Sequence, residues 1–206
     1  MKIKTVCILL FLMLFRFAFP QAIRIEAGMV SSKINQFDDC KSLVTFSPLI
    51  GIDYCVHKHW ELSNEISYMT KGCTLQHLLS TDEHIFISKS STLNIEFHYL
   101  QLNTLFRYKI NFKNTMFYAS VGPKIDILLS TENFNKAATP VNYGLKPSIG
   151  FYELINSRLS LGLNVSYLMD FNTISNNKTI FNNIDLPSEA LRSKTYNVMA
   201  SLKYSL

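Results

Sequence analysis

The sequence of 206 residues contains few charged side chains, few cysteines and glycines, and no long apolar run. Charged residues make up 17% of the chain, whereas an average soluble domain has about 25%. With only 7 glycines and 4 cysteines, the chain is neither collagen-like nor a disulfide scaffold. Its 48% hydrophobic and 13% aromatic content excludes a disordered chain. Since no stretch approaches roughly 18 consecutive apolar residues, we expect no transmembrane helix.

The excess of basic residues is largely confined to the N-terminus. The formal net charge is +5, but Lys2, Lys4 and Arg16 all fall within the first 16 residues. Without these three, 17 basic residues oppose 15 acidic ones, and the charge is only +2. A nearly neutral chain with scattered charge lacks the basic footprint of a nucleic-acid-binding protein, so we expect no nucleic-acid partner.

The first residues have the layout of an export signal. Lys2 and Lys4 precede the apolar run Val6–Phe15, which Arg16 interrupts before the segment Phe17–Ala22. This pattern predicts a signal peptide over residues 1–21. A membrane anchor is the alternative, but ten residues form only about 15 Å of helix, half the thickness of a bilayer.

From Ile23 onward, apolar residues recur with a period of two. In Leu159–Tyr167 every odd-numbered residue is apolar and every even-numbered one is small or polar, which predicts a strand with two different faces. Eight such segments span residues 23–31, 43–56, 60–71, 93–110, 116–129, 142–154, 158–169 and 194–206. In the fourth of them, the alternation of apolar and polar residues changes phase near Tyr99–Leu100, which predicts a β-bulge.

The connections between these segments alternate in length. Short turns at 57–59, 111–115 and 155–157 alternate with long loops at 32–42, 72–92, 130–141 and 170–193. This alternation is typical of outer-membrane barrels. We therefore predict an all-β fold over residues 22–206, an eight-stranded antiparallel up-and-down transmembrane β-barrel with short periplasmic turns and long extracellular loops.

The alternation by itself also fits a soluble, ligand-binding barrel with an apolar interior. Full charges in the middle of strands favour the membrane barrel, since they can pair across a narrow lumen. Aromatic residues near both strand ends favour it too, because such rings concentrate at membrane interfaces. The predicted short-turn girdle is Tyr54, Tyr108, Phe117, Phe151 and Tyr204, and the long-loop girdle is Phe46, Tyr68, Tyr143, Tyr167 and Tyr196.

The predicted polar face carries six charged residues that we expect to form a structural network in the lumen. An eight-stranded barrel is just wide enough for its interior side chains to fill it, and buried charges are costly unless they are paired. We expect Lys124 and Arg107 to lie opposite Glu65 or Glu26. The predicted network consists of Glu26, Glu65, Arg107, Lys124, Asp126 and Lys146.

Three cysteines follow the predicted signal peptide. In a hairpin about the turn at Lys58, position 73 faces a residue near 43, close to Cys40, whereas Cys55 lies at the other end of its strand. We therefore predict a Cys40–Cys73 disulfide at the extracellular rim and a free, inward-facing Cys55 thiol. Three unpaired thiols are the alternative.

Three strings resemble the PorT-like outer-membrane β-barrel family of Gram-negative bacteria. Glu65–Gly72 resembles E-x-x-Y-x-x-K-G, Tyr99–Tyr108 resembles Y-L-x-I-P-x-L-x-x-Y, and Phe117–Leu129 resembles F-Y-x-x-x-G-P-x-x-x-x-L-L. The sequence departs from the family pattern at two places: Asn103 stands where the family has a proline in its fourth strand, and Leu206 stands where it has a terminal aromatic residue. The resemblance implies an outer-membrane location without general enzymatic activity. The member that names the family supports a protein-secretion machine.

The sequence contains no catalytic, cofactor or metal motif that we can identify. His57 and His59 flank a turn without an evident third ligand. We expect a non-enzymatic structural or interaction role at the cell surface, with no cofactor. The expected partners are outer-membrane lipid, the barrel-assembly machinery, and a surface or periplasmic protein. The alternatives are the soluble barrel and an outer-rim enzyme acting on lipid, whose candidate residues would be His77, Ser80, Asp82, Glu83, His84 and His98.

Overall fold

The computed structural model describes residues 21–34, 40–77, 91–132, 138–173, 180–181, 184–185 and 193–206. Within these ranges, the side chains of 55–56, 75–77, 91–93, 180–181 and 184–185 are not described. The predicted signal peptide lies outside the described residues, apart from Gln21. In the described part of the chain, no helix is long and apolar enough to cross a membrane.

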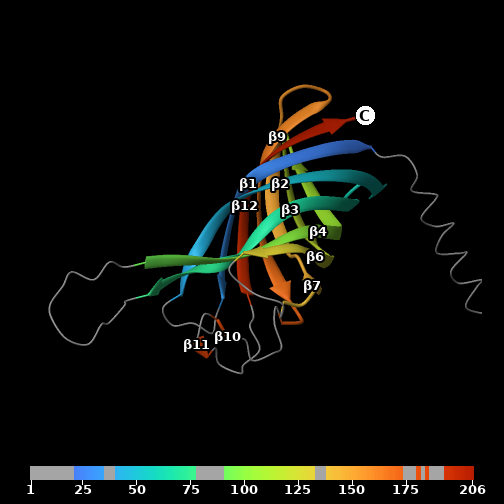
Figure 1. Ribbon diagram of the computed structural model, residues 1–206. Helices are drawn as coiled ribbons and strands as arrows, with labels where there is room; N and C mark the ends of the chain where they lie inside the picture. The colour runs from blue at the N-terminus through green and yellow to red at the C-terminus, as the bar shows by residue number, and fades with distance from the viewer. Residues whose placement is uncertain are drawn as a thin grey trace, which may run out of the picture.

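Antiparallel strands make up the architecture (Figure 1). Six of the strand paths are single long strands: β1 (Ala22–Ile34), β2 (Cys40–His57), β3 (Trp60–His77), β4 (Ser91–Phe112), β9 (Leu159–Asp170) and β12 (Ser193–Ser205). Two further paths are interrupted: β5 (Thr115–Val121) is followed by β6 (Pro123–Glu132), and β7 (Val141–Leu145) by β8 (Ser148–Leu154). A separate small sheet pairs β10 (Ile180–Phe181) with β11 (Ile184–Asp185).

The eight strand paths close into a barrel. β1 pairs with β2 on one side and with β12 on the other, from Ala22 opposite Ser205 to Ile34 opposite Ser193. β12 pairs in turn with β9, and β4 pairs with both β5 and β6. Closure gives each strand a partner on both sides, which is what a sheet in lipid requires. The predicted eight-stranded antiparallel barrel is confirmed.

The two interruptions have local causes. Gly122 separates β5 from β6, and a Cβ atom there would lie 1.9 Å from the carbonyl oxygen of Thr104 on β4. Only glycine permits so close an approach of the two backbones. Pro147 lies between β7 and β8 and has no N–H to donate to a neighbouring strand. The two predicted continuous segments, 116–129 and 142–154, are therefore each broken into two strands.

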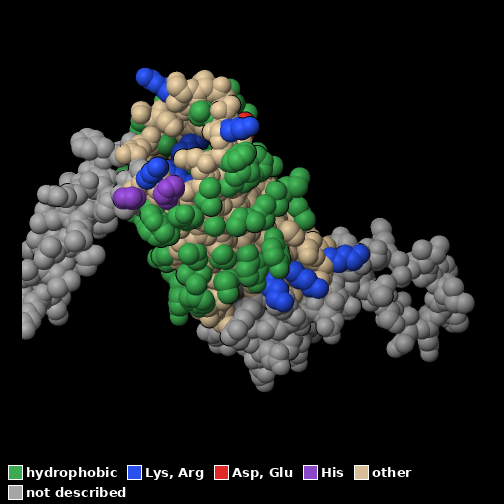
Figure 2. Space-filling model, turned by 180° about the vertical axis from the view of Figure 1, so that it is seen from behind, with side chains coloured by type: hydrophobic (Ala, Val, Ile, Leu, Met, Phe, Trp, Pro, Cys, Tyr) green, Lys and Arg blue, Asp and Glu red, His purple; other side chains and the backbone are tan. Residues whose placement is uncertain are grey.

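The outward face of the barrel is apolar, and the inward face is mostly polar. Along β12, Thr195, Asn197 and Ser201 are buried in the lumen, whereas Tyr196 and Val198 are 54% and 53% exposed. Figure 2 shows apolar side chains gathered into a belt over the middle of the barrel, with basic side chains beyond it. This polarity suits a barrel surrounded by lipid and excludes the soluble barrel with an apolar interior.

Aromatic side chains pack together at both borders of the belt. At the short-turn end, the Trp60 ring stacks on Phe106 with the ring centroids 4.7 Å apart. At the long-loop end, the rings of Tyr167 and Tyr196 lie 4.9 Å apart on neighbouring strands β9 and β12. These contacts place aromatic rings where amphipathic side chains favour the membrane interface.

A β-bulge lies at the predicted level, because the register of β4 with β6 shifts between His98 and Tyr99, but the extra residue is not on β4 as predicted. Odd-numbered residues of β4 point inward without interruption from Ile95 to Arg107. The extra residue is Leu129 on β6, since His98 pairs with Ser130 and Tyr99 with Leu128. The sequence is misleading here because the inward-facing side chains near the long-loop end are apolar. The strands also extend beyond the predicted segments, so that β2 begins at Cys40.

An apolar cluster fills the lumen toward the long-loop end. Met69, Cys73, Phe97 and Tyr99 are fully buried in it, and Leu128 packs against it. Cys40 and Cys73 are joined by a disulfide with their Cα atoms 5.8 Å apart. The side chain of Cys55, predicted to be a free thiol, lies outside the described residues.

Candidate functional site

Six basic and six acidic side chains are buried in the lumen between this cluster and the short-turn rim. None of these side chains is more than 8% exposed, and their formal charges cancel. The basic residues are Arg24, Lys71, Arg107, Lys124, Lys146 and Lys203, and the acidic residues are Glu26, Asp53, Glu61, Glu65, Asp126 and Asp170.

Glu65 of β3 is the centre of the larger group of charges. Its Oε1 accepts a hydrogen bond from Arg24 Nη2 at 2.6 Å, and its Oε2 accepts one from Lys146 Nζ at 2.6 Å. Asn103 also donates to Oε2, at 3.2 Å. Arg24 in addition pairs with Glu26, two residues away on the same face of β1. Strands β1, β3, β4 and the segment between β7 and β8 are thereby joined through the lumen.

Asp53 and Glu61 form the part of this group nearest the short turns. Arg107 Nη1 lies 3.3 Å from Asp53 Oδ2 and 3.2 Å from Glu61 Oε2. Lys203 of β12 contacts the same two carboxylates, at 2.8 and 2.7 Å. Arg24 is a third partner of Asp53, and Lys109 is a third partner of Glu61, each at 3.6 Å. Each of these two carboxylates therefore has three basic partners, the arrangement that offsets the desolvation of buried charge.

A second group of charges lies closer to the apolar cluster. Lys71 Nζ lies 2.7 Å from Asp126 Oδ2 and 3.0 Å from Asp170 Oδ2. Lys124 contacts the same two carboxylates. Gln101 connects the two groups: its Nε2 donates to Asp126 at 2.8 Å, and its Oε1 accepts from Asn103, the residue that donates to Glu65.

Two tyrosines occupy the remaining space on one side of the lumen. The rings of Tyr118 and Tyr152 stack with their centroids 5.3 Å apart, and the Arg107 guanidinium lies 4.4 Å from the Tyr118 centroid. A Cβ atom at Gly150 would lie 2.4 Å from the Tyr118 hydroxyl oxygen, and one at Gly162 would lie 2.7 Å from the Tyr152 ring. The two glycines thus make room for the rings.

All six predicted lumen residues lie inside, but their partners differ in part from those expected. Arg107 lies 3.9 Å from Glu65, as expected, yet it is closer to Asp53 and Glu61. The pairing of Lys124 with Glu65 or Glu26 is wrong, because Lys124 contacts Asp126 and Asp170. Lys146 occupies the expected place beside Glu65. Long side chains reach obliquely across the lumen, so neighbouring strands do not fix the pairs.

The sequence analysis missed half of the network, although the alternation of inward and outward residues along each strand would have identified these residues. Each missed residue lies an even number of positions from an inward-facing residue on the same strand. Arg24 precedes Glu26 by two positions, and Lys203 follows Ser201 by two. The residues missed are Arg24, Asp53, Glu61, Lys71, Asp170 and Lys203.

The two ends of the lumen differ. The apolar cluster and the disulfide occupy the long-loop end. At the short-turn end, a cavity of about 640 Å³ opens into the lumen; Glu61, Lys109, Lys113, Tyr152 and Lys203 are among the residues that line it. Along the strands, the charge network lies between this cavity and the apolar cluster, so we expect a closed interior rather than a continuous channel.

The residues of the alternative enzyme hypothesis and the turn histidines are only partly described. His98 lies on the outward face of β4, away from the lumen network, with its side chain 14% exposed. Ser80, Asp82, Glu83 and His84 lie outside the described residues, as does the side chain of His77. His59 Nδ1 lies 3.2 Å from the carbonyl oxygen of Lys109 at the short-turn rim.

Sequence comparison agrees with the apolar outer face and the charged lumen. Residues 15–206 match the family described as outer membrane protein beta-barrel domain. The chain belongs to this family. This outer membrane barrel matches no curated protein.

Two solved structures share the fold of this outer membrane barrel at low sequence identity. The outer membrane protein OprG from Pseudomonas aeruginosa is 12% identical, with a TM-score of 0.58, and the match covers 91% of this chain and 96% of OprG. Neisserial surface protein A (NspA) is also 12% identical, with a TM-score of 0.51 and coverage of 90% and 99%. These similarities establish the fold.

Proposed function

We propose that this outer membrane barrel is a non-enzymatic protein that presents its long loops at the cell surface for interaction with another protein. The observation that carries the proposal is the filled lumen, in which six basic and six acidic side chains pair and an apolar cluster occupies the long-loop end. Such an interior holds the strands together, so we assign the interaction to the long loops, because loops are the segments that most often carry binding in proteins.

The hairpin of β3 and β4 is the best candidate for an interaction surface. These strands pair as far as Gln76–Thr92 and His77–Ser91, whereas pairing of β4 with β6 ends at Glu96–Glu132. Figure 1 shows this hairpin extending beyond the barrel wall. A long hairpin of this kind can bind a partner by accepting an added strand along its edge.

The proposal includes a route of export to the outer membrane and an orientation of the barrel in it. The signal peptide at 1–21 would direct export, and the barrel-assembly machinery would insert the strands into outer-membrane lipid of a Gram-negative cell. The first and last residues of the barrel, Ala22 and Leu206, lie at the rim that carries the short turns, and we assign this rim to the periplasm. Three strand motifs resemble those of PorT-like barrels, so support of protein secretion is one form of the proposed interaction. Nucleic acid is not among the proposed partners.

Surface labelling tests the orientation. An epitope inserted at position 180, in the last long loop, should be labelled on intact cells, and one in the 57–59 turn should be labelled only after the outer membrane is opened. The reverse pattern would contradict the orientation.

Two further assays test the function. Proteins cross-linked to the long loops and purified from outer membrane should include a surface protein or a surface-exposed secretion component, and a periplasmic partner should instead be cross-linked to the short turns. Purified barrel should neither hydrolyse phospholipid or lipid A nor transfer acyl chains between them. Turnover that is lost in His98→Ala would replace the proposal with the outer-rim enzyme.

A further inference from the structure

An ionisable cluster lies on the outside of the barrel, away from the charged lumen. Glu96 and His98 project outward from β4, and Glu132 projects from the neighbouring strand β6. One ligand atom from each residue lies within 4.8 Å of the other two. Since Glu96 and Glu132 are directly opposite in the register, the backbone itself brings the two carboxylates together. None of these groups takes part in the lumen network.

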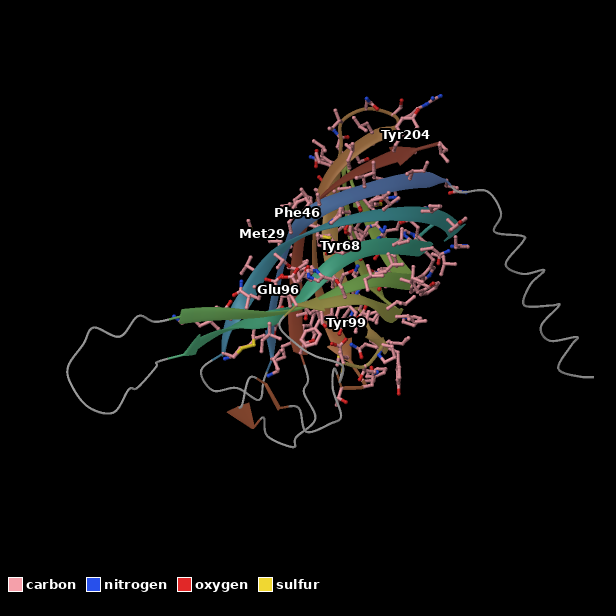
Figure 3. The ribbon with its side chains drawn as sticks, viewed as in Figure 1. Met29, Phe46, Tyr68, Glu96, Tyr99 and Tyr204 are labelled. Atoms are coloured by element: carbon pink, nitrogen blue, oxygen red, sulfur yellow. A yellow bond between two sulfur atoms is a disulfide. The ribbon has the colours of Figure 1, made fainter. Side chains whose placement is uncertain are left out.

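The cluster marks the border of the apolar belt on the long-loop side. Tyr68 and Leu129 are the adjacent outward-facing residues within the belt, 41% and 56% exposed. Figure 3 shows Tyr68 on β3 and Glu96 near the point where the hairpin leaves the barrel wall. The three groups therefore lie at the level where lipid headgroups and water meet the protein, which makes them accessible to ions.

The histidine ring is held in a fixed orientation. His98 Nδ1 lies 2.8 Å from the Tyr68 hydroxyl oxygen and 3.0 Å from Thr70 Oγ1, and the His98 ring stacks on Tyr68. The second nitrogen, Nε2, is thereby turned toward the carboxylates. Hydrogen bonding of one imidazole nitrogen to a neighbouring group is the usual way in which proteins orient a metal-binding histidine.

The distances around Nε2 suit a shared ion better than direct hydrogen bonds. Nε2 lies 3.6 Å from Glu132 Oε1 and 4.0 Å from Glu96 Oε2, beyond the usual hydrogen-bond range. Two ligands bound to one zinc ion at about 2.0–2.1 Å in tetrahedral geometry lie roughly 3.3 Å apart. Small rotations of the partly exposed carboxylates would close the remaining difference.

We propose that Glu96, His98 and Glu132 bind a divalent transition-metal ion, with zinc as the ion that fits best. One imidazole nitrogen and two carboxylate oxygens are three zinc ligands, and water completes a tetrahedral site. The imidazole favours zinc over calcium or magnesium, which prefer oxygen ligands alone. A bound ion would join β4 to β6 beside the bulge at Leu129, where the register between the two strands shifts.

The test is a calorimetric titration of Zn²⁺ into the purified, untagged, full-length barrel in detergent. The titration is carried out at pH 7.5 in a buffer without chelating groups. We expect saturable binding of one equivalent of Zn²⁺. His98→Ala, Glu96→Gln and Glu132→Gln should each weaken binding at least tenfold. Glu153→Gln, which removes an exposed carboxylate at the opposite rim, and His59→Ala should leave binding unchanged.

Co²⁺ provides an independent readout, because tetrahedral binding through His98 should give visible absorption that His98→Ala abolishes. Heat-dependent gel migration establishes that each variant is folded, and His98→Gln replaces His98→Ala if the latter fails. Absence of saturable Zn²⁺ binding by the wild-type protein would overturn the proposal. Equal binding by the wild type and the His98 variant, or binding of Ca²⁺ as strong as that of Zn²⁺, would also overturn it and leave only an acidic surface pair.

Discussion

Replacement of Glu65 by glutamine is the sharpest perturbation of the lumen network. The two side chains have nearly the same shape, so the substitution removes charge without creating a cavity. Both Glu65 oxygens accept hydrogen bonds from basic groups, Oε1 from Arg24 and Oε2 from Lys146. A glutamine has only one carbonyl oxygen, so its NH₂ group must face one of these donors. The lumen then also carries an uncompensated positive charge.

Breaking a buried ion pair by removing one partner costs about 3–5 kcal/mol. With a urea dependence of roughly 2 kcal/mol per molar, the unfolding midpoint of Glu65→Gln should fall by about 2 M. Reversible unfolding from lipid vesicles, followed by the fluorescence of the single tryptophan, Trp60, measures this shift. The double variant Glu65→Gln/Lys146→Met restores charge balance and should lose less stability than the sum of the two single variants.

Glu153→Gln is the matched control, because Glu153 is an exposed carboxylate whose partner is the Thr115 hydroxyl. Its midpoint should not change measurably. If Glu65→Gln unfolds at the same urea concentration as the wild type, or if the effects of the Glu65 and Lys146 substitutions simply add, the lumen charges do not stabilise one another in the way the geometry indicates.

Three further predictions concern other parts of the barrel. Replacing Cys40 and Cys73 with serine should lower the free energy of unfolding by about 3–4 kcal/mol, as expected for a cross-link that spans 33 residues. Non-reducing peptide mapping of the wild type should yield the linked peptide, and alkylation of Cys40 without reductant would contradict the bond. Gly150→Ala should destabilise the barrel by about 1–3 kcal/mol in the same urea assay, because its Cβ would lie 2.4 Å from the Leu163 carbonyl oxygen; an unchanged midpoint would refute the tight contact. Trp60 is 37% exposed on the outward face, so brominated lipids should quench its fluorescence and aqueous iodide should do so weakly; the opposite ranking would place it away from lipid.

The alternation of the sequence was sufficient to predict the barrel and the side of most residues. A period of two assigns each strand residue to one face, and the fixed polarity of a membrane barrel then assigns the charges to the lumen. This reasoning placed Glu26 and Lys146 inside correctly. Applied to every strand, it would also have found Arg24 and Asp53, which share a face with residues already assigned to the lumen.

The same rule fails where an apolar side chain points into the lumen. Phe97 and Tyr99 are apolar but point inward, because the lumen near the long loops is filled by an apolar cluster. Pairing partners were also beyond the reach of the sequence. Lys124 contacts Asp126 on its own strand and Asp170 on β9 because the stagger between strands and the length of the side chains decide which charges meet. The Glu96–His98–Glu132 cluster depends on the register of β4 with β6, which the bulge at Leu129 sets.

Electrical recording from planar lipid bilayers tests the central claim, a closed barrel whose interior is filled by paired charges. The purified wild-type protein, shown to be folded by its heat-dependent gel migration, should insert without stepwise conductance, because the charge network and the apolar cluster occupy the lumen between the two rims. Discrete, reproducible conductance steps from the wild-type protein would show a continuous aqueous path through the barrel and would contradict the account.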